Sequence, residues 1–130
     1  MNLIKVKGVT KRNPREPETA PKYYLSAIHG GQVGVEQLAN EVSKRCSLRN
    51  SDVQGVLLAL MEIIPDEICK GNIVSLGELG TFYVNVSSSG VDSANDLSIS
   101  NLKGFKLIHL ATKKFKKHLR MIDVSMQSAS

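Results

Sequence analysis

The chain has 130 residues, of which 42% are apolar and 5% aromatic, and its formal net charge is +5. This length suits one compact domain with a short extension and leaves no room for two full domains. Because a single copy offers little aromatic and apolar material for a core, the composition favours an obligate dimer.

Positive charge is concentrated at the two ends of the sequence. Residues 1–33 carry six basic and two acidic side chains, and residues 103–130 carry seven and one. Residues 73–102 carry three acidic side chains and no basic one. This distribution is typical of a polyanion-binding surface on a neutral scaffold, with an anionic membrane surface as the competing partner.

The N-terminal third predicts two short strands and a loop. Residues 3–9 alternate apolar residues with two lysines, which is typical of a strand whose lysines face water. Residues 10–21 hold three of the four prolines and are expected to form a loop or arm. The apolar run 23–28 follows, as a strand or as a strip packed against the domain.

Two helices are expected next. Apolar residues recur at intervals of three and four over residues 35–46 and again over residues 53–69. The second stripe is broad enough that a partner subunit is its simplest cover. We expect Asn50 or Ser51 to cap the second helix and Pro65 to kink or break its last turns.

A β-hairpin is predicted over residues 71–84. The runs 74–76 and 82–84 alternate apolar and polar residues, and Gly77 and Gly80 can supply the positive φ that the turn needs. After a polar segment at residues 85–101, expected to be a loop or a weak pair of strands, the chain regains strand character.

The C-terminal part predicts a strand and a basic helix. Residues 102–110 form the strand, and Thr112 is expected to cap a helix whose apolar residues Phe115, Leu119 and Ile122 recur at four and three. Most of the other positions of this helix are basic.

This order resembles the HU and integration-host-factor family of bacterial DNA-bending proteins. The resemblance covers roughly residues 33–119. Its most specific part is the set Lys70-Gly71, Val74, Leu76, Gly80-Thr81-Phe82 and Val84. In its N-terminal extension the chain is similar to the longer HU-related proteins of some anaerobic gut bacteria.

The resemblance implies an α+β intertwined homodimer. The expected fold has a helical base, a three-stranded antiparallel sheet with a β-arm or loop, and a basic C-terminal helix. In this chain an extra N-terminal strand segment is added. We therefore expect an N-terminal extension with a basic proline-rich loop at residues 1–32, an HU-like DNA-binding domain at residues 33–122, and a flexible tail at residues 123–130.

The sequence departs from the family in its arm. Residues 85–101 contain neither the basic side chains nor the proline that the family's arm carries. The stretch Lys11-Arg12-Asn13-Pro14-Arg15 looks like the family's Arg-Asn-Pro arm tip, but it precedes the helices, and we interpret that likeness as coincidence.

No catalytic or metal-binding motif is found in the sequence. It has no glycine-rich phosphate loop before a helix, no GxSxG and no HExxH. His29, His109 and His118 lack metal-ligand spacing, and Cys46 and Cys69 are expected to be buried thiols of a reducing compartment. We expect no enzyme activity, no cofactor, no metal, no small-molecule substrate and no membrane association.

Charge and resemblance together predict a histone-like, nucleoid-architectural homodimer of the cytoplasm that binds and condenses duplex DNA without sequence specificity, mainly through phosphates. The candidate DNA-binding residues are Lys103, Lys106, Lys113, Lys114, Lys116, Lys117, Arg120, Lys11, Arg12 and Arg15. The alternative is an HU-fold dimeric scaffold that has lost DNA binding and engages a protein partner, in which case the basic residues form solvated surfaces.

Overall fold

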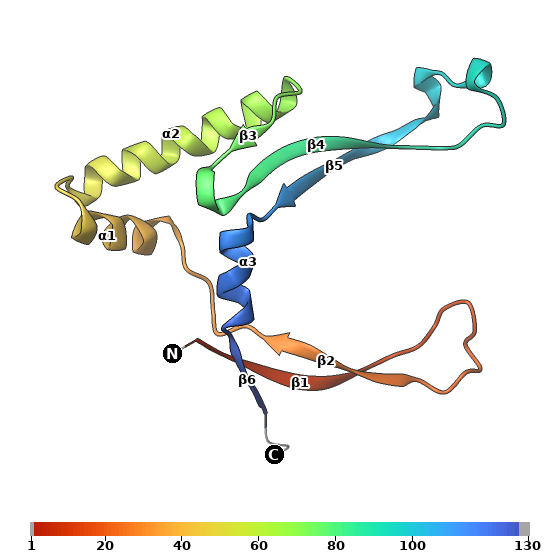
Figure 1. Cartoon of the computed structure of the whole chain (residues 1–130), viewed down its shortest axis with the longest axis horizontal. Helices are drawn as coiled ribbons and strands as arrows, with labels where there is room; N and C mark the ends of the chain where they lie inside the picture. The colour runs from red at the N-terminus through yellow and green to blue at the C-terminus, as the bar shows by residue number, and fades with distance from the viewer. Residues whose placement is uncertain (1, 128–130) are drawn as a thin grey trace. The chain divides into compact units, whose positions relative to one another are not determined.

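The computed structural model describes residues 2–127, and within them the chain has a mixed α+β fold of three α-helices and two three-stranded sheets. The elements, labelled in Figure 1, are β1 (Leu3–Lys11), β2 (Lys22–Ile28), α1 (Val35–Arg45), α2 (Asn50–Cys69), β3 (Val74–Ser75), β4 (Thr81–Ser88), β5 (Leu102–Leu110), α3 (Lys113–Arg120) and β6 (Asp123–Met126). The α+β prediction and the expected helix and strand order are confirmed.

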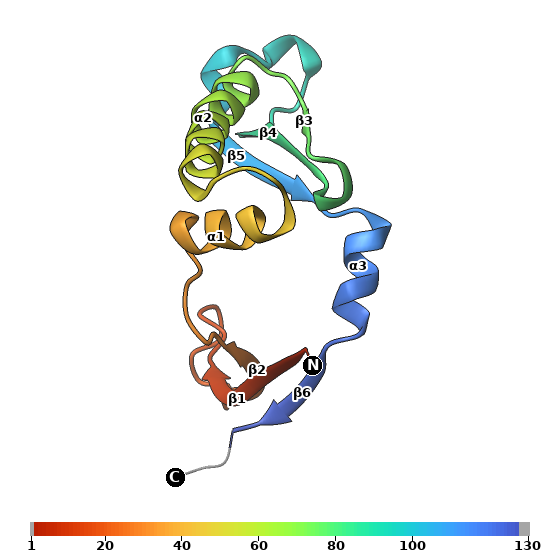
Figure 2. The same cartoon turned by 90° about the vertical axis from the view of Figure 1, so that its left-hand side faces the viewer.

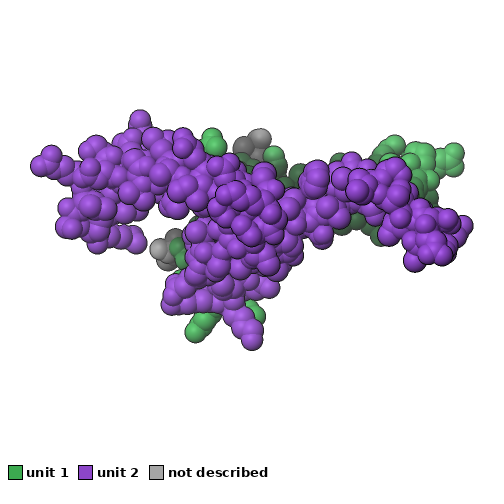
Figure 3. All heavy atoms as spheres, turned by 90° about the horizontal axis from the view of Figure 1, so that it is seen from above, with its two compact units in different colours: residues 1–33, 117–130 green, residues 34–116 purple. Residues whose placement is uncertain are grey.

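The chain separates into two compact units, which Figure 3 shows in different colours. One unit comprises residues 1–33 and 117–130 and holds the sheet β2-β1-β6. The other comprises residues 34–116 and holds α1, α2 and the antiparallel sheet β3-β4-β5. The boundary falls inside α3, so the last turn of the basic helix groups with the N-terminal extension.

The helical part of the second unit has a small core. Helix α2 lies beside β3 and β4 in both views of the chain (Figures 1 and 2). Among residues 2–127 the buried apolar side chains are Ala39, Val53 and Ile68. Cys46 and Cys69, expected to be buried, are instead exposed free thiols. The reason is that each lies at the C-terminal end of a helix that this thin core does not cover.

The expected cap of α2 is wrong, and of the two outcomes expected at Pro65 the break does not occur. Arg49 occupies the N-cap position, and Asn50 is already helical. The side chain of Asn50 therefore accepts a hydrogen bond from Gln54 Nε2 at 2.6 Å instead of capping the helix. The helix also continues past Pro65 to Cys69 without a break.

The end of α2 leads tightly into the hairpin. Gly71 has φ of 91°, and the Asn72 N–H donates back to the Glu67 carbonyl at 3.1 Å. The Glu67 carboxylate accepts hydrogen bonds from Asn72 Nδ2 at 2.8 Å and from Lys70 Nζ at 3.2 Å. The pKa of Glu67 is held below its usual value mainly by the hydrogen bond from Asn72. The hydrogen bond from Lys70 and the charge of Lys70 lower it further.

The predicted hairpin is confirmed. Val74 pairs with Phe82, and the Leu76 N–H donates to the Gly80 carbonyl at 2.9 Å. Gly77 and Gly80 have φ of 60° and 112°. Gly80 is buried, and a Cβ there would overlap the carbonyl oxygen of Leu110 at the end of β5. Only glycine fits this position without moving the backbone.

The polar segment after the hairpin is more ordered than a loop. Strand β4 continues to Ser88, and residues 89–101 form a cap that holds two short 3₁₀ turns. The Ser89 N–H donates to the Asn101 carbonyl at 2.9 Å, and Asn101 Nδ2 donates to Ser89 Oγ at 3.0 Å, which closes the cap. Of the two alternatives for this segment, the weak strands near Ser98 and Ile99 are absent from its described residues, because Ile99 begins a 3₁₀ turn.

The two strands and the loop expected in the N-terminal extension are confirmed, and the strands pair as a β-hairpin. Strands β1 and β2 pair from Lys5 opposite Ile28 to Lys11 opposite Lys22. Strand β6 runs parallel to β1 over Leu3–Val6 only. Beyond Val6 the hairpin therefore continues as a two-stranded ribbon.

Strand β6 corrects the expected flexible tail. Residues 123–126 form this strand because the Asp123 N–H donates to the Asn2 carbonyl and the Gln127 N–H to the Val6 carbonyl, both at 2.8 Å. Residues 128–130 of the expected tail lie outside the described residues.

The approach of Gly80 to Leu110 generates a stability prediction. Gly80→Ala should lower the free energy of unfolding by about 3 kcal/mol or more, since both φ and the Leu110 carbonyl oppose a side chain. Gly77→Ala is the matched control: its φ is also positive but no atom lies within 4 Å of the added Cβ, so about 1 kcal/mol is expected. Urea unfolding measures both losses of stability. Equal losses would show that the Leu110 carbonyl does not restrict residue 80.

Candidate nucleic-acid interface

The turn of the β3–β4 hairpin holds the start of α3. Thr112 Oγ1 donates to the Glu78 carbonyl at 2.6 Å, and Lys114 Nζ lies 2.6 Å from the Glu78 carboxylate. His109 Nε2, at the end of β5, lies 2.8 Å from the Leu79 carbonyl oxygen. These bonds tie the direction in which α3 leaves the sheet to a turn that is 34 residues earlier in the sequence.

The first turn of α3 is capped and packed. The Thr112 hydroxyl accepts a hydrogen bond from the Phe115 N–H at 3.2 Å, so the predicted cap is confirmed. The half-buried ring of Phe115 meets the ring of His109 edge-on, with centroids 6.5 Å apart. His109 stacks in turn on Phe82 at 4.5 Å. Sheet and helix are thus joined by an aromatic contact as well as by the turn.

The exposed face of α3 is a stripe of cations. At 3.6 residues per turn, four basic residues fall within about 100° of one another, opposite the apolar residues of the helix. They are Lys113, Lys116, Lys117 and Arg120, and all four are exposed. We call this set the α3 stripe. Lys114 lies beside it and pairs with Glu78; both side chains are exposed, so the pair contributes little to stability.

The two predicted DNA-binding residues on β5 lie on opposite faces of the sheet. Lys103 and Lys106 are three residues apart in one strand, and side chains alternate between the faces of a sheet. Lys103 therefore shares a face with Phe105, and Lys106 shares the opposite face with Ile108. At most one of them can contact a ligand that approaches a single face of the sheet.

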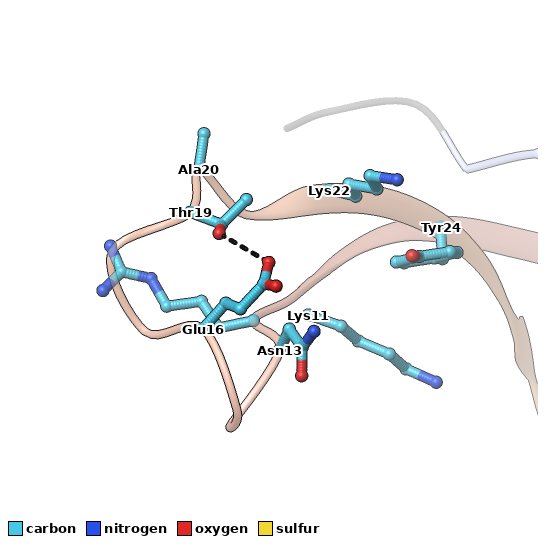
Figure 4. Close-up of a pocket in the computed structure, with 8 residues that line it drawn as sticks. Lys11, Asn13, Glu16, Thr19, Ala20, Lys22 and Tyr24 are labelled. Carbon is cyan, nitrogen blue, oxygen red and sulfur yellow. Dashed lines mark hydrogen bonds between the residues drawn. The ribbon is translucent and has the colours of Figure 1, made fainter.

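The N-terminal candidates belong to the unit formed by residues 1–33 and 117–130. Lys11, Arg12 and Arg15 are at the tip of the β1–β2 hairpin. Lys11 and Arg12 line a pocket of about 310 Å³ there, and Arg15 does not (Figure 4). Lys11 Nζ lies 5.7 Å from the centroid of the Tyr24 ring, a cation–π contact.

Three further cations of this hairpin join the candidates; the sequence already indicated a lysine-bearing strand face for Lys5 and Lys7, and Lys22 was missed. The register places Lys5, Lys7 and Lys22 on the same face as Lys11. Lys5, Lys7 and Lys11 are separated by even numbers of residues, a pattern that places them on one face of a strand. The position of Lys22 on that face depends on the pairing of β1 with β2.

Other classes of site find no support in residues 2–127. These residues contain no group of three or more His, Cys, Asp or Glu side chains placed to hold a metal ion. A helix with the length and apolar character to cross a bilayer is likewise absent from the described part of the chain.

Comparisons with known proteins agree with this fold. The sequence model of the family described as HU domain fused to wHTH, Ig, or glycine-rich motif matches residues 3–126. No curated protein matches the sequence. Among solved structures, the chain is similar to that of a candidate bacterial DNA-binding protein from Bacteroides vulgatus ATCC 8482, with a TM-score of 0.63 at 11% sequence identity. The similarity covers 100% of this chain and 51% of the other, so the chain spans about half the length of that protein.

The Thr112 cap can be tested directly. Thr112→Ala removes the hydroxyl that accepts from the Phe115 N–H and donates to the Glu78 carbonyl, and it should cost about 1 to 2 kcal/mol of stability. Thr112→Ser keeps the hydroxyl and should retain most of it. Urea unfolding, together with hydrogen exchange at the amide of Phe115, distinguishes them. A serine variant as unstable as the alanine variant would argue against the cap.

Proposed function

Because the chain belongs to the family of HU domains fused to wHTH, Ig or glycine-rich motifs, we propose that it binds duplex DNA with little sequence preference, as a histone-like architectural protein of the nucleoid. The observation that carries this proposal is the α3 stripe, four exposed cations on one face of a helix that is anchored to the sheet. The description of the Bacteroides vulgatus protein as a candidate DNA-binding protein supports the same function.

The chemistry of the stripe favours phosphate contact over base readout. Three of its four members are lysines, whose ammonium groups act as point charges and lack the planar fork that recognises a base edge. Cations aligned along a helix neutralise successive phosphates and release counterions, a term that is independent of sequence. Affinity should therefore depend steeply on salt and weakly on base composition.

We also propose that the functional form is a homodimer built on α2. Val56, Leu60 and Ile63 recur at four and three along α2 and form one exposed apolar stripe. A second copy is the occupant with a matching apolar face, since obligate interfaces resemble a core divided between two chains.

DNA binding is tested by fluorescence anisotropy with a labelled duplex of about 30 base pairs at about 50 and 200 mM salt. The wild type should bind at low salt and lose affinity as salt rises. A quadruple variant replaces the whole α3 stripe, Lys113, Lys116, Lys117 and Arg120, by Gln. It should bind at least tenfold more weakly, and the slope of log affinity against log salt should become shallower by about 3 to 4. The control is Lys44, Arg45, Arg49 and Lys70→Gln, which removes the same charge from the helical part and should change affinity less than threefold.

The control separates stripe contacts from total charge. Equal losses in the two quadruple variants would mean that only net charge matters. A wild-type dimer that fails to bind duplex at low salt would instead favour the scaffold function, in which the chain engages a protein partner.

The dimer is tested by sedimentation equilibrium. Wild-type protein should sediment at twice the chain mass of 14.2 kDa. Ile63→Asp places a carboxylate in the apolar stripe of α2 and should shift the equilibrium to monomer or unfolded chain, because the buried charge would lack a partner. Ser51→Asp adds the same charge to the exposed first turn of α2 and should leave the mass unchanged. A wild-type monomer would refute the proposal.

A further inference from the structure

The β1–β2 hairpin places all of its strand lysines on one of its two faces, which also carries Val9 and Ile28. Directly paired residues share a face, so the register of β1 and β2 assigns every side chain of the ribbon. All four lysines of the two strands fall on one face, together with Tyr24; they are Lys5, Lys7, Lys11 and Lys22. The other face holds Val6, Leu25 and Tyr23 and contains no charged side chain between Val6 and Thr10 or their partners.

Burial of the opposite face does not explain this placement. A strand commonly sends its lysines to water when its other face is covered by a core. Here Tyr23 is 79% exposed and Leu25 66% exposed on the face without lysines. Protection of a sheet edge also fails as an explanation, because lysines on either face would protect the edge equally well.

The hairpin carries excess charge that the rest of the structure does not balance. Residues 5–28 include six basic and two acidic side chains, a net charge of +4. The salt bridges within residues 2–127 join Lys44 to Glu41, Lys70 to Glu67 and Lys114 to Glu78, and none of them involves the hairpin. Glu16, which could neutralise the tip, accepts a hydrogen bond from Thr19 Oγ1 at 3.2 Å.

The end of the ribbon places like charges together. Lys11 and Lys22 lie directly opposite each other in the register, an arrangement that is unfavourable in the absence of an anion. Both line the pocket of about 310 Å³ at the tip, together with Arg12, Tyr24 and Glu16 (Figure 4). A phosphate group near Lys11 and Lys22 would relieve their repulsion.

The tip itself is held by two turns in succession. The Glu16 N–H donates to the Asn13 carbonyl and the Thr19 N–H to the Glu16 carbonyl, each at 3.1 Å. The Asn13 side chain accepts from the Arg15 N–H at 3.0 Å. Arg12 therefore precedes a defined turn and Arg15 lies within it, which reduces the entropy lost when they contact a ligand.

From these observations we propose that the β1–β2 hairpin is a second DNA-contacting element, which lays its lysine face along duplex phosphates and is separate from the α3 stripe. This inference rests on the proposed function, since it adds a surface to the same activity. The seven residues of strand from Lys5 to Lys11 span about 20 Å. That length covers about six phosphates of one DNA strand along the helix axis, and a two-stranded ribbon fits the major groove.

The test compares two triple variants in the salt titration. The hairpin variant replaces Lys7, Lys11 and Lys22 by Gln. It should bind duplex at least tenfold more weakly at about 50 mM salt, and its slope of log affinity against log salt should be shallower by about 2 to 3. Lys44, Arg45 and Arg49→Gln removes the same charge from α1 and its connection to α2, and should change affinity less than threefold. A hairpin variant that matches this control in affinity and slope would overturn the inference.

A second measurement uses wild-type protein and so does not depend on the folding of a variant. Acetylation of lysine amines, read by mass spectrometry with and without duplex, should show several-fold protection of Lys7, Lys11 and Lys22 and none of Lys44. Protection of the α3 lysines without protection of the hairpin would overturn the inference while leaving the proposed function intact. Absence of duplex binding by the wild type would overturn both.

Discussion

The close approach of the Gly77–Gly80 turn to the end of β5 is the contact on which the candidate interface depends. Gly80 has no room for a Cβ beside the Leu110 carbonyl, and Glu78 and Leu79 offer carbonyl oxygens to Thr112 and His109. One turn therefore closes the β3–β4 hairpin, positions the end of β5 and supports the cap of α3. The first turn of α3 is therefore held by the side chains of Thr112 and His109 on the backbone of the turn, and not by any interaction among the cations themselves.

Local chemistry explains why much of this could be predicted from the sequence. The hairpin depends on two glycines and two alternating runs, and the start of α3 depends on a threonine three residues before Phe115, which are patterns that a short window of sequence contains. Helices α1 and α2 follow from their periodic apolar residues in the same way. The sequence therefore predicts the basic face of α3, and the structure adds its contact with Glu78.

The predictions failed where the structure depends on distant pairing. Strand β6 exists because residues 123–126 meet β1 at the other end of the chain, and no pattern near Asp123 indicates this partner. The shared face of Lys11 and Lys22 likewise depends on the register of two strands separated by a ten-residue tip. The exposure of Cys46 and Cys69 has another cause: periodicity shows which residues are apolar, but not whether one chain alone can cover them.

The two β-ribbons of the chain have opposite chemistry. The β4–β5 ribbon ends in a cap that carries Asp92, Asp96 and an Ile99 that is 89% exposed, without a basic side chain. The β1–β2 ribbon has a net charge of +4. Each carboxylate near a phosphate is repelled by about 1 kcal/mol at 4 Å in water, and each ammonium is attracted by as much. Electrostatics therefore favours the N-terminal ribbon over the acidic cap for the proposed DNA contact. The cap nevertheless occupies the position in the sequence where the resemblance predicts an arm.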